Sequence, residues 1–149
     1  MRKIYFLIKI LIIYCFIFSI SFAAKSSYFD QGKKLFEKKE FNNSKIFFEK
    51  DIVFNPKSEK SYLYLAKIFD KDNNDLEQEI NLKNVLLLNP KNDEAIYMFV
   101  LLKIKQSDYS KAKEMIERFD LVCMSFCGKK KEIREKFNKL TPENDKDHN

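Results

Sequence analysis

The stretch FNPKS at residues 54–58 returns as LNPKN at residues 88–92, which places Pro56 and Pro90 34 residues apart. Proline has no backbone N–H and disfavours helical conformation in the residue before it, so each Asn-Pro pair predicts the end of one helix and the start of another. A turn that recurs by chance has unrelated flanks, whereas a structural repeat carries its whole apolar pattern with it.

The apolar pattern does recur at the same spacing. Each unit indicates two amphipathic helices separated by a polar break, at EFNNSK (40–45), KDNNDLEQ (71–78) and QSDYS (106–110). Asn42 and Asn43 suit a turn and a helix start, and Asp75 with Gln78 is typical of a capping box. The matched columns are Tyr28, Tyr62 and Ile96; Gly32, Ala66 and Val100; and Phe48, Leu82 and Ile116.

Four residues depart from the columns in which they fall. Lys103 follows Leu35 and Phe69, Gln78 lies between Ser44 and Ala112, Asp51 precedes Val85 and Phe119, and Met124 stands in the proline column. Two of the four, Lys103 and Met124, fall in the third unit.

The spacing and the columns resemble the tetratricopeptide repeat family, whose units are helix–turn–helix elements of 34 residues. The resemblance implies an all-α fold, a short right-handed solenoid of three repeats at residues 25–58, 59–92 and 93–124. One such unit cannot bury its apolar face alone, so stacking supplies the core and the last unit needs a cap. KKKEIREKFNKL at residues 129–140 provides a capping helix, because Ile133, Phe137 and Leu140 share one helix face. Residues 141–149 are polar, and we expect them to be disordered.

The N-terminus has the layout of a secretory signal. Arg2 and Lys3 precede an uncharged run over residues 10–20, and the small residues Ser21 and Ala23 close it. We expect a signal-peptide helix that is cleaved after residue 23, and a periplasmic mature protein. The alternative is that residues 4–24 are retained as an inner-membrane anchor, with the repeats facing the periplasm.

The charge is too dilute for nucleic-acid recognition. The formal net charge is +6, and it falls to +3 without residues 1–23, which hold Arg2, Lys3 and Lys9 and no acid. The remaining lysines alternate with acids, as on solvated helices, and form no basic stripe. We therefore expect no nucleic-acid partner, and no membrane contact unless the N-terminal segment is retained.

Cys123 and Cys127 remain after cleavage. In an exported chain an even pair favours a disulfide. Residues i and i+4 of a regular helix have β-carbons about 5–6 Å apart, whereas a disulfide needs about 3.8 Å, so pairing requires the helix to stop. Gly128 directly follows Cys127, which is consistent with a turn closed by the disulfide. The alternatives are two buried thiols on one helix face, or a redox-active pair.

Catalytic and metal chemistry have few residues to use. The single histidine, His148, falls in the polar tail, and two glycines cannot form a phosphate loop. A zinc site needs four ligands, which leaves us expecting no metal, no cofactor and no enzymatic activity.

The resemblance instead implies a non-enzymatic adaptor in a bacterial cell envelope, which holds a peptide or helix of a protein partner in a concave groove. A membrane-anchored assembly factor and a thiol–disulfide redox protein are the alternatives. Some relatives hold a C-terminal carboxylate with a lysine–asparagine clamp, but Phe29, Tyr64 and Glu94 occupy three of those places here. The groove residues carried over are Phe29, Lys33 and Phe36 from the first unit, Leu63, Lys67 and Asp70 from the second, and Tyr97, Leu101 and Ile104 from the third.

Overall fold

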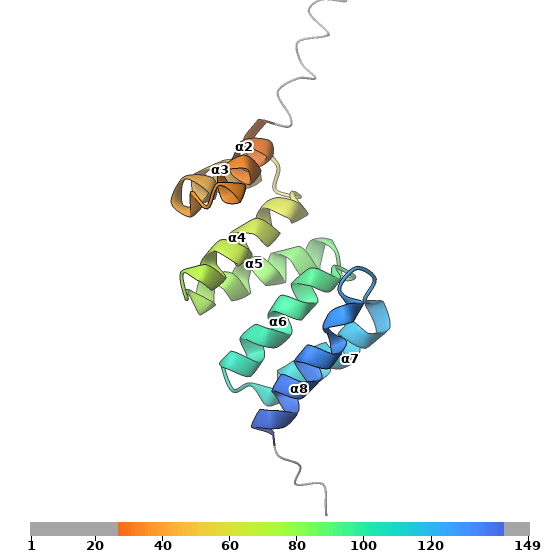
Figure 1. The fold of residues 1–149 in the computed structure, drawn as a ribbon. Helices are drawn as coiled ribbons and strands as arrows, with labels where there is room; N and C mark the ends of the chain where they lie inside the picture. Colours follow the sequence, from red (N-terminus) through yellow and green to blue (C-terminus); the bar gives the residue numbers. More distant parts are fainter. Residues whose placement is uncertain (1–26, 142–149) are drawn as a thin grey trace, which may run out of the picture. The chain divides into compact units, whose positions relative to one another are not determined.

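The computed structural model describes residues 27–141, and this part of the chain is helical throughout, with no strand (Figure 1). The expected signal-peptide helix and residues 142–149 of the tail lie outside the described residues. The prediction of an all-α fold with three helix–turn–helix units and a further C-terminal helix is confirmed. The helices are α2 (Ser27–Glu37), α3 (Phe41–Phe54), α4 (Glu59–Lys71), α5 (Asp75–Leu88), α6 (Asp93–Lys105), α7 (Tyr109–Val122), the 3-10 turn η1 (Cys127–Lys129) and α8 (Lys130–Leu140).

The chain forms two compact units, which do not coincide with the three sequence repeats. The first ends at Lys50, and the second, which contains the last two repeats and α8, begins at Asp51. In the first unit α2 crosses α3 closely at Gly32. A β-carbon at Gly32 would lie 2.8 Å from Cε1 of Phe48, and the hydroxyl of Ser44 donates a 2.8 Å hydrogen bond to the Gly32 carbonyl. The Phe48 ring therefore occupies the space that a larger residue at position 32 would need.

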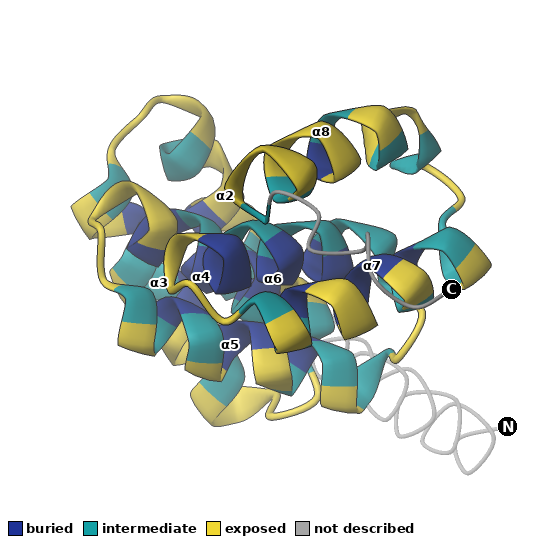
Figure 2. Ribbon diagram, turned by 90° about the horizontal axis from the view of Figure 1, so that it is seen from below, coloured by how far each residue is buried: buried dark blue, intermediate teal, exposed yellow. Residues whose placement is uncertain are grey.

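In the second unit α4 packs against α5, α5 against α6, and α6 against α7, while α8 contacts both α6 and α7. Ile133 is the one buried residue of α8, which is otherwise mostly exposed in Figure 2. The continuous apolar core comes from every helix of this unit after α3. It comprises Leu63, Ala66, Leu82, Val85, Ala95, Ile96, Phe99, Val100, Leu102, Ile104, Ala112, Met115, Ile116, Phe119 and Ile133.

The turns inside the three helix pairs share one geometry. Lys39, Asn73 and Ser107 each adopt a left-handed backbone, with φ of 64°, 54° and 60°, and they are 34 residues apart. The next residue in each turn donates its N–H to a carbonyl five residues earlier, as Asn74 does to Phe69. This closure satisfies carbonyls that the end of a helix would otherwise leave unpaired.

Two helix starts differ from the sequence-based expectation. Asn74 caps α5, because its side-chain oxygen accepts a hydrogen bond from the N–H of Glu77 at 3.2 Å, so Asp75 is the first helical residue and not the cap. Asn42 and Asn43 lie inside the first turn of α3, which begins at Phe41. In the turns before α5 and α7, the N-cap residue, Asn74 or Asp108, directly follows the left-handed residue.

Within residues 27–141, no helix combines the length and the apolar character that crossing a membrane requires.

Candidate functional site

The residues expected to line the groove fall on α2, α4 and α6, and those on α2 belong to the first unit. Phe29 lies against Phe48, with ring centroids 5.8 Å apart, and Phe36 meets Phe41 edge-on at 5.2 Å. Lys33 is exposed and forms a 3.8 Å ion pair with Glu37, one turn further along α2. Both aromatic side chains therefore pack between α2 and α3, and Lys33 contributes a solvated charge.

On α4, the three expected residues have different surroundings. Leu63 is buried in the core of the second unit. Asp70 is exposed and accepts a 3.2 Å hydrogen bond from the side-chain amide of Gln78 on α5. Lys67 is half-buried, and its ammonium forms a 2.7 Å ion pair with Glu94 at the start of α6.

The Lys67–Glu94 pair joins the two inner helices of the second unit. The two side chains are 24% and 27% exposed. The Lys67 ammonium also lies 4.9 Å from the ring centroid of Tyr64, a favourable cation–π distance. Sequence reasoning noted Glu94 only as a departure from the carboxylate clamp and missed this pairing.

On α6, α8 engages Tyr97. The Tyr97 hydroxyl donates a 2.8 Å hydrogen bond to Glu132, and the Lys129 ammonium lies 5.7 Å from the ring centroid. Burial together with the hydrogen bond and charge of Glu132 raises the pKa of Tyr97 to about 12. The aromatic ring also contacts Phe119 and Phe126. Tyr97 is therefore part of the docking surface for the C-terminal helix.

The other two α6 residues differ in how far they reach the surface. Leu101 is half-buried and packs against the core, whereas Ile104 is buried within it. Met98, which was not among the expected residues, is half-buried in the same way as Leu101. Because they are three residues apart, Met98 and Leu101 lie on one side of α6.

The cysteine pair closes the turn that follows α7. Cys123 and Cys127 form a disulfide, with α-carbons 5.2 Å apart, and α7 ends at Val122 immediately before it. The helix therefore stops where a disulfide requires it to stop, and the bridge occupies the place of the Asn-Pro turns.

A carboxylate of α6 holds this bridged turn. The Oδ2 atom of Asp93 accepts hydrogen bonds from the backbone N–H groups of Met124, Ser125 and Phe126 at 2.7, 2.6 and 2.9 Å. Burial raises the pKa of Asp93, but these donors lower it more, so that it lies below its usual value. Glu59, 34 residues earlier, anchors the turn between α5 and α6 in a similar way. Its Oε1 accepts hydrogen bonds from the side-chain amides of Asn89 and Asn92 at 3.0 and 2.6 Å.

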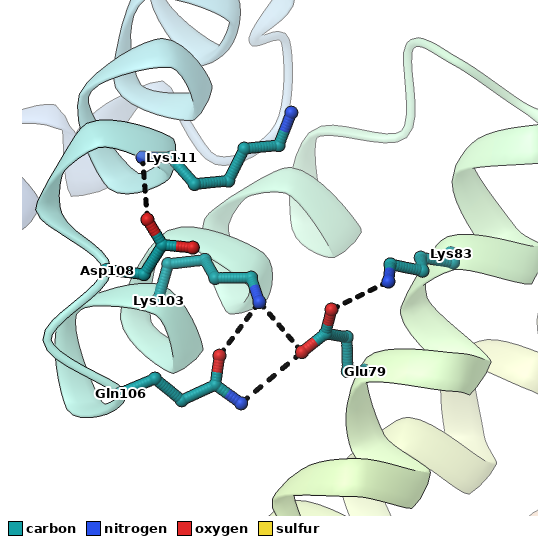
Figure 3. A network of polar contacts seen from close by, with 6 residues as sticks. All are labelled: Glu79, Lys83, Lys103, Gln106, Asp108 and Lys111. Carbon is teal, nitrogen blue, oxygen red and sulfur yellow. Dashed lines mark hydrogen bonds and ion pairs between the residues drawn. The ribbon is translucent and has the colours of Figure 1, made fainter.

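Lys103, which breaks an apolar column, is buried because α5 supplies its partner. Its ammonium lies 2.7 Å from Glu79 Oε2 and 2.8 Å from the side-chain oxygen of Gln106 (Figure 3). Glu79 also pairs with Lys83 at 2.7 Å. Burial raises the pKa of Glu79, whereas hydrogen bonds from Lys103, Lys83 and Gln106 and the charge of Lys103 lower it, with a net fall from 4.5 to about 2. This network fixes α6 on α5.

The other two polar departures are also buried. Asp51 accepts a hydrogen bond from the hydroxyl of Ser61. Gln78 donates to Asp70, but its own carbonyl oxygen has no partner among the described residues. Both residues therefore make a polar contact between neighbouring helices.

The part of the chain that the structure describes holds no cluster of three or more His, Cys, Asp or Glu residues that suits a metal ion.

Comparison with known proteins defines the class of fold. No family model and no curated protein matches the chain. Solved structures do match. The TPR2B domain of yeast Sti1 in its pHsp70 complex is 17% identical with a TM-score of 0.69, over 78% of this chain and 95% of that one. The first TPR of Spaghetti (RPAP3), bound to the HSP90 peptide SRMEEVD, is 14% identical with a TM-score of 0.70, over 78% and 93%. The Sgt2 TPR domain from Aspergillus fumigatus is 12% identical with a TM-score of 0.67, over 85% and 87%.

These matches share one fold and little sequence. The chain therefore has the tetratricopeptide-repeat fold, as the repeated columns predicted.

Proposed function

We propose that this protein is a non-enzymatic adaptor that holds a peptide or helix of a partner protein against its inner helices. The observation that carries the proposal is the shared fold, because two of the similar domains were solved with pHsp70 and with an HSP90 peptide. Helical repeats of this kind present an extended surface for such ligands.

The inner helices of the second unit offer suitable contact groups. Met98 and Leu101 are each half-buried, so part of each apolar side chain reaches the surface of α6. Lys67 and Glu94 lie across from one another on α4 and α6 and supply a polar margin. A partly apolar patch with a few fixed charges is a common composition for a peptide-binding surface.

We further propose that the adaptor works outside the cytoplasm, in a bacterial cell envelope. The secretory pattern of residues 1–23 supports this location, and so does the Cys123–Cys127 disulfide, because disulfides persist in oxidising compartments. In the alternative, residues 4–24 remain as a membrane anchor. N-terminal sequencing of the protein from envelope material separates the two, since a start at residue 24 supports the cleaved form.

Crosslinking from a single position tests the binding face. A photo-reactive residue placed at Leu101 should crosslink to a partner peptide, which mass spectrometry identifies. The same residue placed at exposed Lys113 on α7 is the control. The synthetic peptide should then bind the full chain saturably, and Leu101→Asp should weaken that binding by about tenfold or more, equivalent to about 1.4 kcal/mol. Equal crosslinking from both positions, or unchanged binding by folded Leu101→Asp, would refute the proposal.

A further inference from the structure

The positive charge of Lys67 already has a counter-charge within the protein. It makes a 2.7 Å ion pair with Glu94 and lies 4.9 Å from the Tyr64 ring centroid. Both charged side chains are about three-quarters covered, at 24% and 27% exposed. Partial burial weakens solvent screening, so this pair is stronger than a typical surface ion pair.

The position of Glu94 at the start of α6 stabilises the negative charge that pairs with Lys67. Glu94 lies in the first turn of α6, where the unpaired N–H groups of the helix favour negative charge. Its carboxylate is part of the same chain, so it is always present near Lys67. A ligand carboxylate that approached Lys67 would either displace Glu94 and leave it without its partner, or share the ammonium with Glu94 against the repulsion between two carboxylates.

The neighbouring charge acts in the same direction. Asp70 is exposed one turn further along α4 and adds a second negative group near Lys67. An acidic ligand therefore meets a neutralised lysine beside an acid. By contrast, the similar Spaghetti domain was solved with SRMEEVD, a peptide whose end is acidic.

We infer that Glu94 determines which class of partner this face accepts: an internal segment of a protein chain that brings no carboxylate to Lys67, and not an acidic C-terminal end. This inference rests on the proposed adaptor function and gives it a partner chemistry. In it, Glu94 occupies Lys67 as a built-in carboxylate and so excludes the acidic ligands that a free lysine would attract.

Fluorescently labelled SRMEEVD and its C-terminal carboxamide provide the test. Both are titrated against the full chain as wild type, Glu94→Gln, and Lys67→Gln/Glu94→Gln. Glu114→Gln is the matched control, since it removes one exposed carboxylate from α7, where Glu114 pairs with Lys111. Far-UV circular dichroism establishes that each variant is folded.

The wild type should bind the acid and the carboxamide equally, and Glu114→Gln should do the same. Glu94→Gln should strengthen binding of the acid peptide by about tenfold, because Lys67 gains a charge-assisted hydrogen bond to the terminal carboxylate. The carboxamide, which keeps only its side-chain carboxylates, should gain clearly less. The double variant should lose that gain. A wild type that prefers the acid, or a folded Glu94→Gln with no gain, would overturn the inference. Neither outcome bears on whether Leu101 contacts a partner, so the proposed function is tested separately.

Discussion

Replacing Glu79 with glutamine leaves the buried ammonium of Lys103 without its counter-charge. The depressed pKa of Glu79, from 4.5 to about 2, corresponds to a stabilisation of about 3 kcal/mol at neutral pH. Removing one partner from a buried pair costs about 3–5 kcal/mol. Because Glu79 is 19% exposed and Gln106 still accepts from Lys103, we expect Glu79→Gln to lower the free energy of unfolding by about 2–3 kcal/mol.

The direction of the pKa shift also determines how the stability difference between wild type and Glu79→Gln changes with pH. The folded pKa of Glu79 is below the unfolded one, so its stabilisation is complete above pH 4.5 and is lost as the pH falls from 4.5 toward 2. The difference between wild type and Glu79→Gln should therefore shrink by more than half between pH 6 and pH 3. Urea unfolding followed by far-UV circular dichroism, with the disulfide intact, measures this difference.

Two further variants sharpen the experiment. Glu114→Gln removes an exposed carboxylate and should change stability by less than about 0.5 kcal/mol. Lys103→Met should cost less than about 1 kcal/mol, because an apolar residue suits the core and Glu79 keeps Lys83 and Gln106. If Glu79→Gln proves as stable as Glu114→Gln, or if its deficit is the same at both pH values, the reasoning is refuted.

Two other predictions concern the disulfide and Gly32. Cys123→Ser/Cys127→Ser should lower the free energy of unfolding by about 2 kcal/mol, the chain-entropy value for so short a loop; reductant should do the same to wild type, and urea curves unaffected by either change would contradict this. Gly32→Ala should destabilise by about 1–3 kcal/mol, because the new β-carbon would lie 2.8 Å from the fully buried Phe48 ring. Gly128→Ala, which has no atom within 4 Å of its β-carbon, is the control in the same thermal and urea melts, and equal effects of the two changes would exclude the steric explanation.

The fold could be predicted from the sequence because apolar contacts between stacked units repeat with the chain. Leu82, Ile96 and Ile116 are buried in one core and Tyr62 packs against it, as their shared columns predict. The positions of the helix caps are harder to predict from the sequence. Lys39, Asn73 and Ser107 share a left-handed backbone but no side-chain chemistry, so their column carries no compositional signal. The caps that follow, Asn74 and Asp108, do match in type, and this was the available clue.

The details of the site depend on geometry between helices that sequence spacing does not encode. In the sequence Lys103 is a misfit in an apolar column, and only the structure places Glu79 of α5 beside it. Lys67 and Glu94 come from α4 and α6, which are separated in the chain by α5, and neither residue alone indicates the pair. Tyr97 was expected to face a partner, yet α8 engages it, since the register of a capping helix depends on how it docks and not on its own periodicity.

The carboxylates of Glu59 and Asp93 have a consequence for how the chain tolerates change. Each carboxylate lies on another helix and accepts hydrogen bonds from the turn, so the turn needs only to present N–H groups at the right positions. Asn89 and Asn92 offer side-chain amides, while the stretch Met124–Phe126 offers its backbone. One anchoring position thus accepts two unrelated loops, so the sequence of such a junction can vary as long as it presents N–H groups to the carboxylate.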